Sequence, residues 1–151
     1  TLCYRATGAY PVEQPRSFLF PRGFGTLGFS VPAAFGAKIG QPNCQVVALV
    51  GDGGFMFTSA ELATAVKYEL GVPVIIFNND SYGVVRSIQL RKYERSTGCD
   101  IVNPDFVEYA RSFGAHAQRI DAEEVTAELP GALGAAFGRK VPTVIELPIE
   151  S

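Results

Sequence analysis

The stretch QVVALVGDGG, residues 45–54, joins a run of apolar and β-branched residues to a turn of small residues that contains one acid. Such a run is typical of a strand buried on both faces, as in a parallel sheet. A second stretch, VPVIIFNND at residues 72–80, repeats the arrangement and ends in two asparagines and an aspartate. Both polar turns therefore follow predicted buried strands. They are either ordinary strand ends or parts of one site for a charged ligand.

Helical and strand patterns alternate along the rest of the chain. Residues 17–20, 45–50, 73–77, 115–120 and 141–147 are expected to be strands. Residues 30–40, 58–70, 82–93, 104–113 and 122–137 are expected to be helices, with Thr58 and Asn103 as two of the caps. This alternation predicts an α/β fold with a doubly wound, mostly parallel sheet and helices on both faces. Residues 1–16 are expected to be an irregular segment that leads into one domain over residues 17–151.

Composition excludes several classes of protein. The net charge of −2 and the absence of a basic stripe argue against nucleic acid as a partner. No apolar stretch is long enough to predict a membrane span. Three cysteines without a CxxC spacing suit a reducing cytoplasm, and His116, the single histidine, makes a zinc site a poor expectation. The chain begins with Thr1 rather than Met, which fits a processed chain or a piece of a longer one.

The residues of the two turns suggest a cation and a phosphate. Ligands of such sheets bind at the carboxyl ends of the strands, where both turns lie. Successive glycines expose backbone N–H groups that suit a phosphate, but the carboxylate of Asp52 would repel it unless a cation lay between them. The amide oxygen of Asn79 and the backbone carbonyl of Ser81 would add two more oxygens. A set of oxygens without sulfur or imidazole suits Mg²⁺ or Ca²⁺.

Other interpretations of the glycines fit less well. The spacing GxxxxGK[ST] of a phosphate-binding P-loop is absent. Gly23, Gly25 and Gly28 match the dinucleotide spacing GxGxxG and follow a predicted strand. The acidic residue expected about 20 positions later is missing, however, because apolar residues 46–50 fill that region. A dinucleotide-binding oxidoreductase domain stays a less favoured alternative.

Three segments together resemble a known family. GDGGF followed by NNDSYG is similar to the thiamin diphosphate motif that begins GDG and ends NN. The segments GTLGFSVPAAFGAK and NPDFVEYARSFGA resemble two further segments of the same enzymes, and the likeness runs over residues 18–149. The chain looks like the carboxyl-terminal, diphosphate-binding domain of acetolactate synthases and benzoylformate-type decarboxylases. The resemblance implies thiamin diphosphate and Mg²⁺ as cofactors and a 2-oxo acid as substrate, with decarboxylation or carboligation as the reaction.

The resemblance also implies roles for individual residues. Asp52, the side chain of Asn79 and the carbonyl of Ser81 match the metal ligands, and the N–H groups of Gly53 and Gly54 match those that face the diphosphate. Leu27 matches the apolar residue that holds the cofactor in its bent form, and the carbonyl of Gly25 matches the one that accepts from the pyrimidine amino group. The implied cofactor-binding set is Gly25, Thr26, Leu27, Gly51, Gly53, Gly54, Ser81, Tyr82 and Gly83.

No catalytic residue is expected in this chain. The family's activating glutamate lies in a pyrimidine-binding domain of the same or a neighbouring subunit, and nothing here matches it; Glu61 is expected to be structural. Val85 stands where pyruvate decarboxylases have a glutamate, tryptophan is absent, and His116 is expected in the core or at a sheet edge. The resemblance therefore implies half of an active site in a homo-oligomer that needs a partner domain. The alternative is a non-catalytic module that binds thiamin diphosphate.

Overall fold

The structure, a computed structural model, describes residues 2–149 and contains one sheet of four parallel strands in the order β1-β2-β4-β3. The strands are β1 (Ala48–Gly51), β2 (Pro73–Asn78), β3 (His116–Arg119) and β4 (Thr143–Pro148). The helices are α1 (Leu2–Ala9), α2 (Ser30–Gly40), α3 (Asp52–Met56), α4 (Glu61–Lys67), α5 (Gly83–Tyr93), α6 (Phe106–Ser112) and α7 (Val125–Phe137). The parallel α/β fold predicted from the sequence is confirmed.

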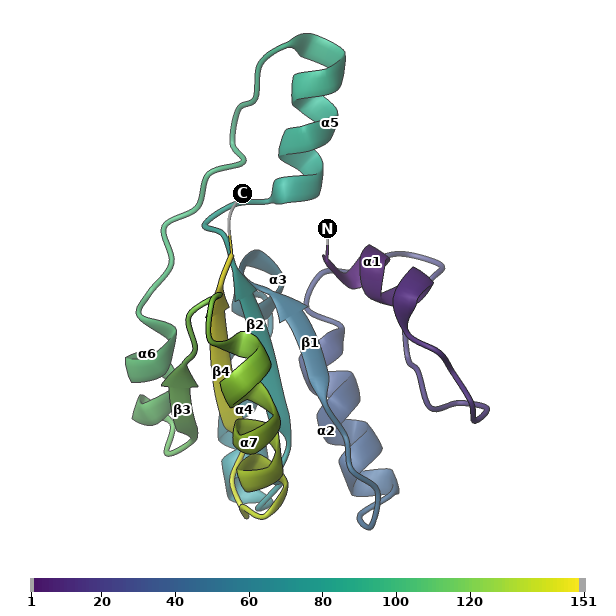
Figure 1. Cartoon of the computed structure of the whole chain (residues 1–151), viewed down its shortest axis with the longest axis vertical. Coiled ribbons are helices and arrows are strands. Elements are labelled where there is room, and N and C mark those ends of the chain that lie inside the picture. Colours follow the sequence, from purple (N-terminus) through teal and green to yellow (C-terminus); the bar gives the residue numbers. More distant parts are fainter. Residues whose placement is uncertain (1, 150–151) are drawn as a thin grey trace.

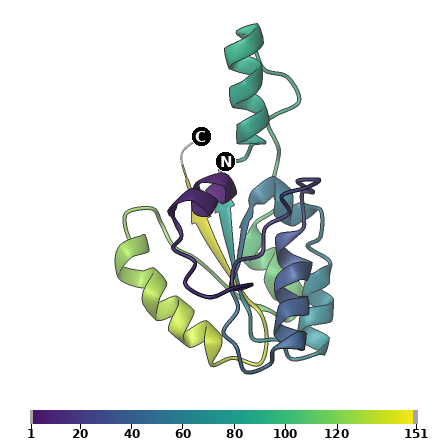
Figure 2. The same cartoon turned by 90° about the vertical axis from the view of Figure 1, so that its right-hand side faces the viewer.

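Helices cover both faces of the sheet, as Figures 1 and 2 show. On one face the larger core joins apolar side chains of α2, α3, α4 and α6 to Val50, Val74 and Val144 of the strands. On the other face Ile75 and Ile145 pack against α7. The two faces use alternate residues of the same strands, which is why these strands are apolar throughout rather than at every second position.

The register of the sheet aligns the two polar turns. Gly51, the last residue of β1, pairs with Phe77 of β2. Asp52 and Asn78 therefore begin their turns at the same level of the carboxyl edge. The chain turns away from β2 at Asp80, whose φ of 51° is a left-handed conformation that aspartate tolerates better than most residues. Beyond this turn α5 stands out from the body of the molecule (Figure 1).

Four local predictions are wrong. Residues 2–9 form α1 instead of an irregular segment, and residues 17–20 form no strand. The hydroxyl of Thr58 donates to the carbonyl of Gly28 at 2.9 Å, so α4 begins at Glu61 without a side-chain cap. Asp105 rather than Asn103 caps α6, because its carboxylate accepts from the N–H of Glu108 at 2.9 Å. At Thr58 a long-range contact, and at Asp105 a better placed acceptor, takes precedence over the local sequence pattern.

Candidate functional site

Asp52 is a buried carboxylate without a cationic partner among the side chains of residues 6–149. It is the first residue of α3 and is 2% exposed. Its Oδ2 accepts a hydrogen bond of 2.9 Å from Nδ2 of Asn103, and it is in no ion pair with any side chain of residues 6–149. Removing a carboxylate from water is costly unless a cation or several hydrogen bonds compensate. The site therefore fits a bound cation next to Asp52.

The first turn of α3 offers backbone N–H groups. Gly53 and Gly54 lie in this turn, and no side chain caps it, although Gly51 has the extended conformation of a cap residue. The first N–H groups of a helix have no partner within the helix and favour anions. The ring of Tyr82 packs directly on Gly53, where an added Cβ would overlap it. The ring of Tyr82 is thus one reason why this position has no side chain, and close contact with a bound anion would be a second.

Ser81 presents an unpaired backbone carbonyl. It forms an isolated antiparallel bridge with Asp100, in which Tyr82 N donates to Cys99 O at 2.8 Å and Ile101 N donates to Asp80 O at 3.0 Å. In such a pair the ladder bonds belong to the flanking residues, so the carbonyl of Ser81 points away from the facing segment. The hydroxyl of Ser81 is buried and has no hydrogen-bond partner in the part of the chain that the structure describes. Neither oxygen is committed to a hydrogen bond with another described residue.

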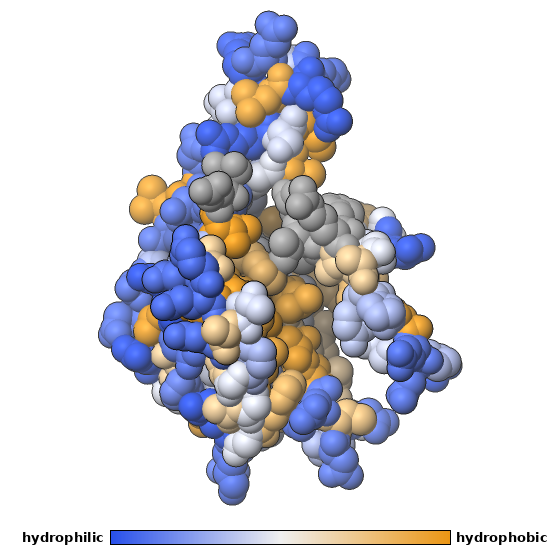
Figure 3. All heavy atoms as spheres, viewed as in Figure 1, coloured by the Kyte–Doolittle hydropathy of each residue, from blue (hydrophilic) through white to orange (hydrophobic). Residues whose placement is uncertain are grey.

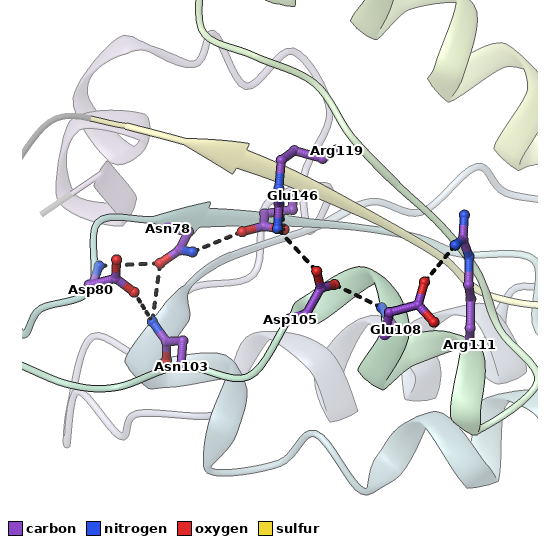
Figure 4. A network of polar contacts seen from close by, with 8 residues as sticks. All are labelled: Asn78, Asp80, Asn103, Asp105, Glu108, Arg111, Arg119 and Glu146. Atoms are coloured by element: carbon purple, nitrogen blue, oxygen red, sulfur yellow. Dashed lines mark hydrogen bonds and ion pairs between the residues drawn. The ribbon is translucent and has the colours of Figure 1, made fainter.

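Asn103 brings the oxygens of both turns together, and Figure 4 shows its contacts with Asn78 and Asp80. Its Nδ2 donates to Asp52 Oδ2 and to Asp80 Oδ1 at 2.9 Å, and lies 3.1 Å from Asn78 Oδ1. Asn79 takes no part in this cluster and forms no hydrogen bond with another described side chain; it lines an open cavity of about 490 Å³, together with Asn78 and Asp80. Its amide oxygen is therefore uncommitted.

A buried glutamate on the neighbouring strand β4 accepts a hydrogen bond from Asn78. Glu146 of β4 is 2% exposed and accepts from Nδ2 of Asn78 at 2.8 Å. Its other oxygen accepts from Arg119 at 3.0 Å (Nε) and 2.9 Å (Nη2). This hydrogen bond and charge raise the pKa of Arg119 above its ordinary value. Glu146 thus fixes which end of the Asn78 amide faces Asn103.

Asp105 extends this network to α6. Its carboxylate lies 3.6 Å from Nη2 of Arg119 while it caps the helix. The backbone N–H of Glu108, with a smaller contribution from the charge of Arg119, holds the pKa of Asp105 below its usual value. Side chains from β2, β4, β3 and the segment before α6 are therefore connected through polar contacts at one edge of the sheet (Figure 4).

The loop at residues 25–28 lies beside α3. Gly28 has a φ of 85°, and a Cβ at this position would lie 2.9 Å from atoms of both Phe57 and Thr58. Together with the bond from Thr58 to the Gly28 carbonyl, this contact anchors the end of the loop. Gly25, Thr26 and Leu27 remain exposed, Leu27 at 48%. The structure thus places the end of this loop next to the turn that begins α3 and leaves its three predicted ligand-binding residues accessible.

His116 lies away from this edge, as expected. It opens β3, an outer strand, and its Nε2 is 3.3 Å from Nη2 of Arg139. Because arginine can only donate, Nε2 accepts and the ring is neutral. Burial, and the charges of Arg139 and Arg111, lower the pKa of His116.

This lowered pKa predicts a pH-dependent stability. Because the unfolded chain binds the proton first, the free energy of unfolding should fall as the pH drops below about 6.5 and continue to fall through the folded-state pKa. Urea unfolding at pH about 7.5 and about 5.5 would measure this loss. The variant His116→Gln should lose less stability on acidification than the unchanged chain. An equal loss in both would assign the effect to other groups.

Sequence reasoning missed Asn103, Glu146 and Arg119 as parts of the site. Glu146 could have been noticed, since one charged residue interrupts the apolar run of residues 141–147. Asn103 gave no such signal because Asn-Pro is an ordinary helix start. Among the described side chains, no three of His, Cys, Asp or Glu gather as a metal site. No helix in residues 2–149 is long and apolar enough to cross a membrane.

Comparisons with known proteins identify the fold and the cofactor. A probable 2-ketoarginine decarboxylase of Pseudomonas aeruginosa is 42% identical over 97% of this chain and 26% of its own length. An acetolactate synthase of Bacillus subtilis is 35% identical over 91% of this chain and 24% of its own length. A solved thiamine diphosphate-dependent 4-hydroxybenzoylformate decarboxylase of Rhodococcus jostii superposes with a TM-score of 0.75 at 32% identity, covering 83% of this chain and 24% of that one.

The chain spans about a quarter of the length of these relatives. Residues 2–147 match the family described as thiamine pyrophosphate enzyme, C-terminal TPP binding domain, in which thiamine pyrophosphate is another name for thiamin diphosphate. The buried acid, the open first turn of α3 and the NN turn lie together in this matched region. The chain therefore belongs to the thiamin diphosphate enzymes, as their carboxyl-terminal cofactor-binding domain.

Proposed function

We propose that this domain binds thiamin diphosphate through Mg²⁺ as part of an enzyme that acts on 2-oxo acids. The observation that carries the proposal is Asp52, a buried carboxylate without a cation, located where the first turn of α3 and the NN turn meet. A divalent cation would neutralise this carboxylate and allow a diphosphate to approach the N–H groups of Gly53 and Gly54.

The individual residues would divide the binding between metal and cofactor. Asp52, the amide oxygen of Asn79 and the carbonyl of Ser81 would hold the cation, and diphosphate and water oxygens would complete six-fold coordination. The cofactor-binding residues proposed with them are Gly25, Thr26, Leu27, Gly51, Gly53, Gly54, Ser81, Tyr82 and Gly83. When bound, thiamin diphosphate supplies the nucleophile and the electron sink that decarboxylation of a 2-oxo acid requires. The chain's own contribution is to anchor and orient this group.

The names of the relatives support the substrate class. 2-Ketoarginine and 4-hydroxybenzoylformate are both 2-oxo acids, and the proteins named for them match most of this chain. Decarboxylation of such an acid, or carboligation of the kind an acetolactate synthase performs, is the reaction proposed for the whole protein.

A partner domain would complete the active site. On the face shared with α7, Figure 3 shows apolar residues at the surface; Val47 is 38% exposed and Phe77 is partly buried. Helix α5 has no buried residue, and its large apolar side chains Val85, Ile88, Leu90 and Tyr93 are exposed. We propose that residues 17–151 form the diphosphate-binding domain and that a pyrimidine-binding domain, from the same or a second subunit of an oligomer, covers such surfaces. That domain would supply the activating glutamate. We also propose that the whole protein is cytoplasmic.

Calorimetry tests the proposal directly. Thiamin diphosphate is titrated into the chain with Mg²⁺ and, separately, with EDTA, and NAD is titrated as a competitor for the same site. Binding that requires Mg²⁺ and is not displaced by NAD is the expected result. Metal-independent binding of NAD would favour the dinucleotide alternative; that alternative is already weakened because GxGxxG follows no strand in the structure.

A further inference from the structure

One amide group lies among three side-chain oxygens at the proposed metal site, only one of which, on Asp52, belongs to a proposed ligand. Nδ2 of Asn103 is 2.9 Å from Asp52 Oδ2, 2.9 Å from Asp80 Oδ1 and 3.1 Å from Asn78 Oδ1. An amide nitrogen carries only two protons, so three acceptors converge on two donors. Two of these acceptors are carboxylates that would repel each other without a donor or a cation between them.

The position of Asn103 is fixed on both sides. Two residues before it, Ile101 N donates to the carbonyl of Asp80 at 3.0 Å. Two residues after it, Asp105 caps α6 and lies 3.6 Å from Nη2 of Arg119. The segment between these two anchors has little freedom, and Asn103 is partly buried within it.

The orientation of the Asn103 amide is also determined. Glu146 accepts from Nδ2 of Asn78 at 2.8 Å, which leaves Oδ1 of Asn78 facing Asn103. Rotating the Asn103 amide by half a turn would place its oxygen against three other oxygens. Nδ2 must therefore face the cluster.

We propose that Asn103 is a positioning residue for the divalent cation, an inference that rests on the proposed function. Its amide holds Oδ2 of Asp52 and leaves Oδ1, which has no hydrogen bond to another described residue, facing the cation. It also separates Asp52 from Asp80, so that Asp52 alone is presented as the carboxylate ligand. Carboxylates that bind metals are commonly held by such outer hydrogen bonds, and losing one typically weakens metal affinity about 10–100-fold.

A purely structural role for Asn103 makes a different prediction. If Asn103 served only to attach residues 101–105 to the NN turn, its removal would lower the unfolding temperature by the same amount with or without Mg²⁺. A positioning role instead changes the affinity for the metal and therefore the increase in unfolding temperature that the metal produces.

The experiment measures Mn²⁺ binding by electron paramagnetic resonance, since Mn²⁺ takes the same oxygen ligands as Mg²⁺. The chain is compared with Asn103→Ala, with Asp52→Ala and with Asn43→Ala, a matched control because Asn43 is exposed in the loop between α2 and β1. Asn103→Ala should bind Mn²⁺ about 10–100-fold more weakly, and Asn43→Ala should bind it unchanged. Equal affinity in Asn103→Ala and the unchanged chain overturns the inference and leaves the proposed function standing. If the unchanged chain binds no Mn²⁺ even with thiamin diphosphate present, or binds it equally after Asp52→Ala, both are overturned.

A second variant decides the matter if Asn103→Ala does not fold. Asn103→Asp keeps the shape of the side chain but replaces the donor with a third carboxylate beside Asp52 and Asp80. Its unfolding temperature without metal should fall, and added Mg²⁺ should raise that temperature more than it does in the unchanged chain, because only a cation relieves the repulsion. A shift with Mg²⁺ equal to that of the unchanged chain would contradict the positioning role.

Discussion

Replacing Asp52 with alanine should abolish Mg²⁺-dependent binding of thiamin diphosphate, with a loss in affinity of more than about 100-fold. Loss of an outer hydrogen bond to a metal ligand typically weakens metal affinity about 10–100-fold, and loss of the only carboxylate ligand should exceed that range. The turn would then have no carboxylate to hold the cation that bridges it to the diphosphate. Calorimetry of the variant in Mg²⁺ and in EDTA should give the same absence of binding in both.

The stability of the same variant separates loss of the site from loss of the fold. Without metal, Asp52 is a buried carboxylate with one hydrogen bond, so replacing it with alanine removes an unfavourable group. The unfolding temperature of the metal-free variant should therefore be no lower than that of the unchanged chain. Asp121→Ala is the matched control, because Asp121 is exposed and lines the cavity at the same edge of the sheet. Mg²⁺-dependent binding that survives in Asp52→Ala would contradict the proposed metal site.

The sequence was sufficient to predict that the two turns lie side by side. Runs of apolar residues before Gly51 and before Asn78 are typical of strands buried on both faces, and their alternation with helical patterns favours a parallel sheet covered by helices. Consecutive strands of such a sheet place their carboxyl ends at one edge, and the pairing of Gly51 with Phe77 confirms this. The prediction was possible because the burial of both faces of a strand leaves its mark in that strand's own residues, without reference to the rest of the chain.

The hydrogen bonds within the site could not be predicted in the same way. Asn103 and Asp52 are 51 residues apart, and the Glu146–Asn78 bond joins residues 68 apart. Such contacts depend on the order of the strands and on the path of the segment before α6, neither of which has a local sequence pattern. Thr58 shows the same limit, since a carbonyl 30 residues away takes the hydroxyl that the capping pattern assigned to its own helix.

Replacing Arg119 with alanine should lower the free energy of unfolding by about 3 kcal/mol, the lower end of the range for breaking a buried ion pair. The side chain of Glu146 is 3% exposed and would remain in the sheet without a counter-charge. The side chain of Arg119 is 46% exposed, so water partly screens the pair and the higher end of the range is not expected. Urea unfolding at neutral pH measures the change.

A second arginine serves as the matched control. Arg86 lies 3.5 Å from Asp100, whose side chain is 82% exposed, so Arg86→Ala should change the free energy of unfolding by less than about 1 kcal/mol. Equal effects of the two substitutions would show that the Arg119–Glu146 pair is no stronger than a surface ion pair.

A double variant tests whether the loss comes from the charge of Glu146. In Arg119→Ala/Glu146→Gln the neutral amide needs no counter-charge, and it can still accept from Nδ2 of Asn78 through its oxygen. The double variant should therefore recover much of the stability lost in Arg119→Ala, and Glu146→Gln alone should be less harmful than Arg119→Ala alone. If the double variant is as unstable as Arg119→Ala, the arginine stabilises the fold through the packing of its aliphatic stem and its contact with Asp105. Glu146 would then hold Asn78 in place without depending on Arg119. The Glu146–Asn78 contact and the Arg119–Asp105 contact would be energetically independent parts of the polar network.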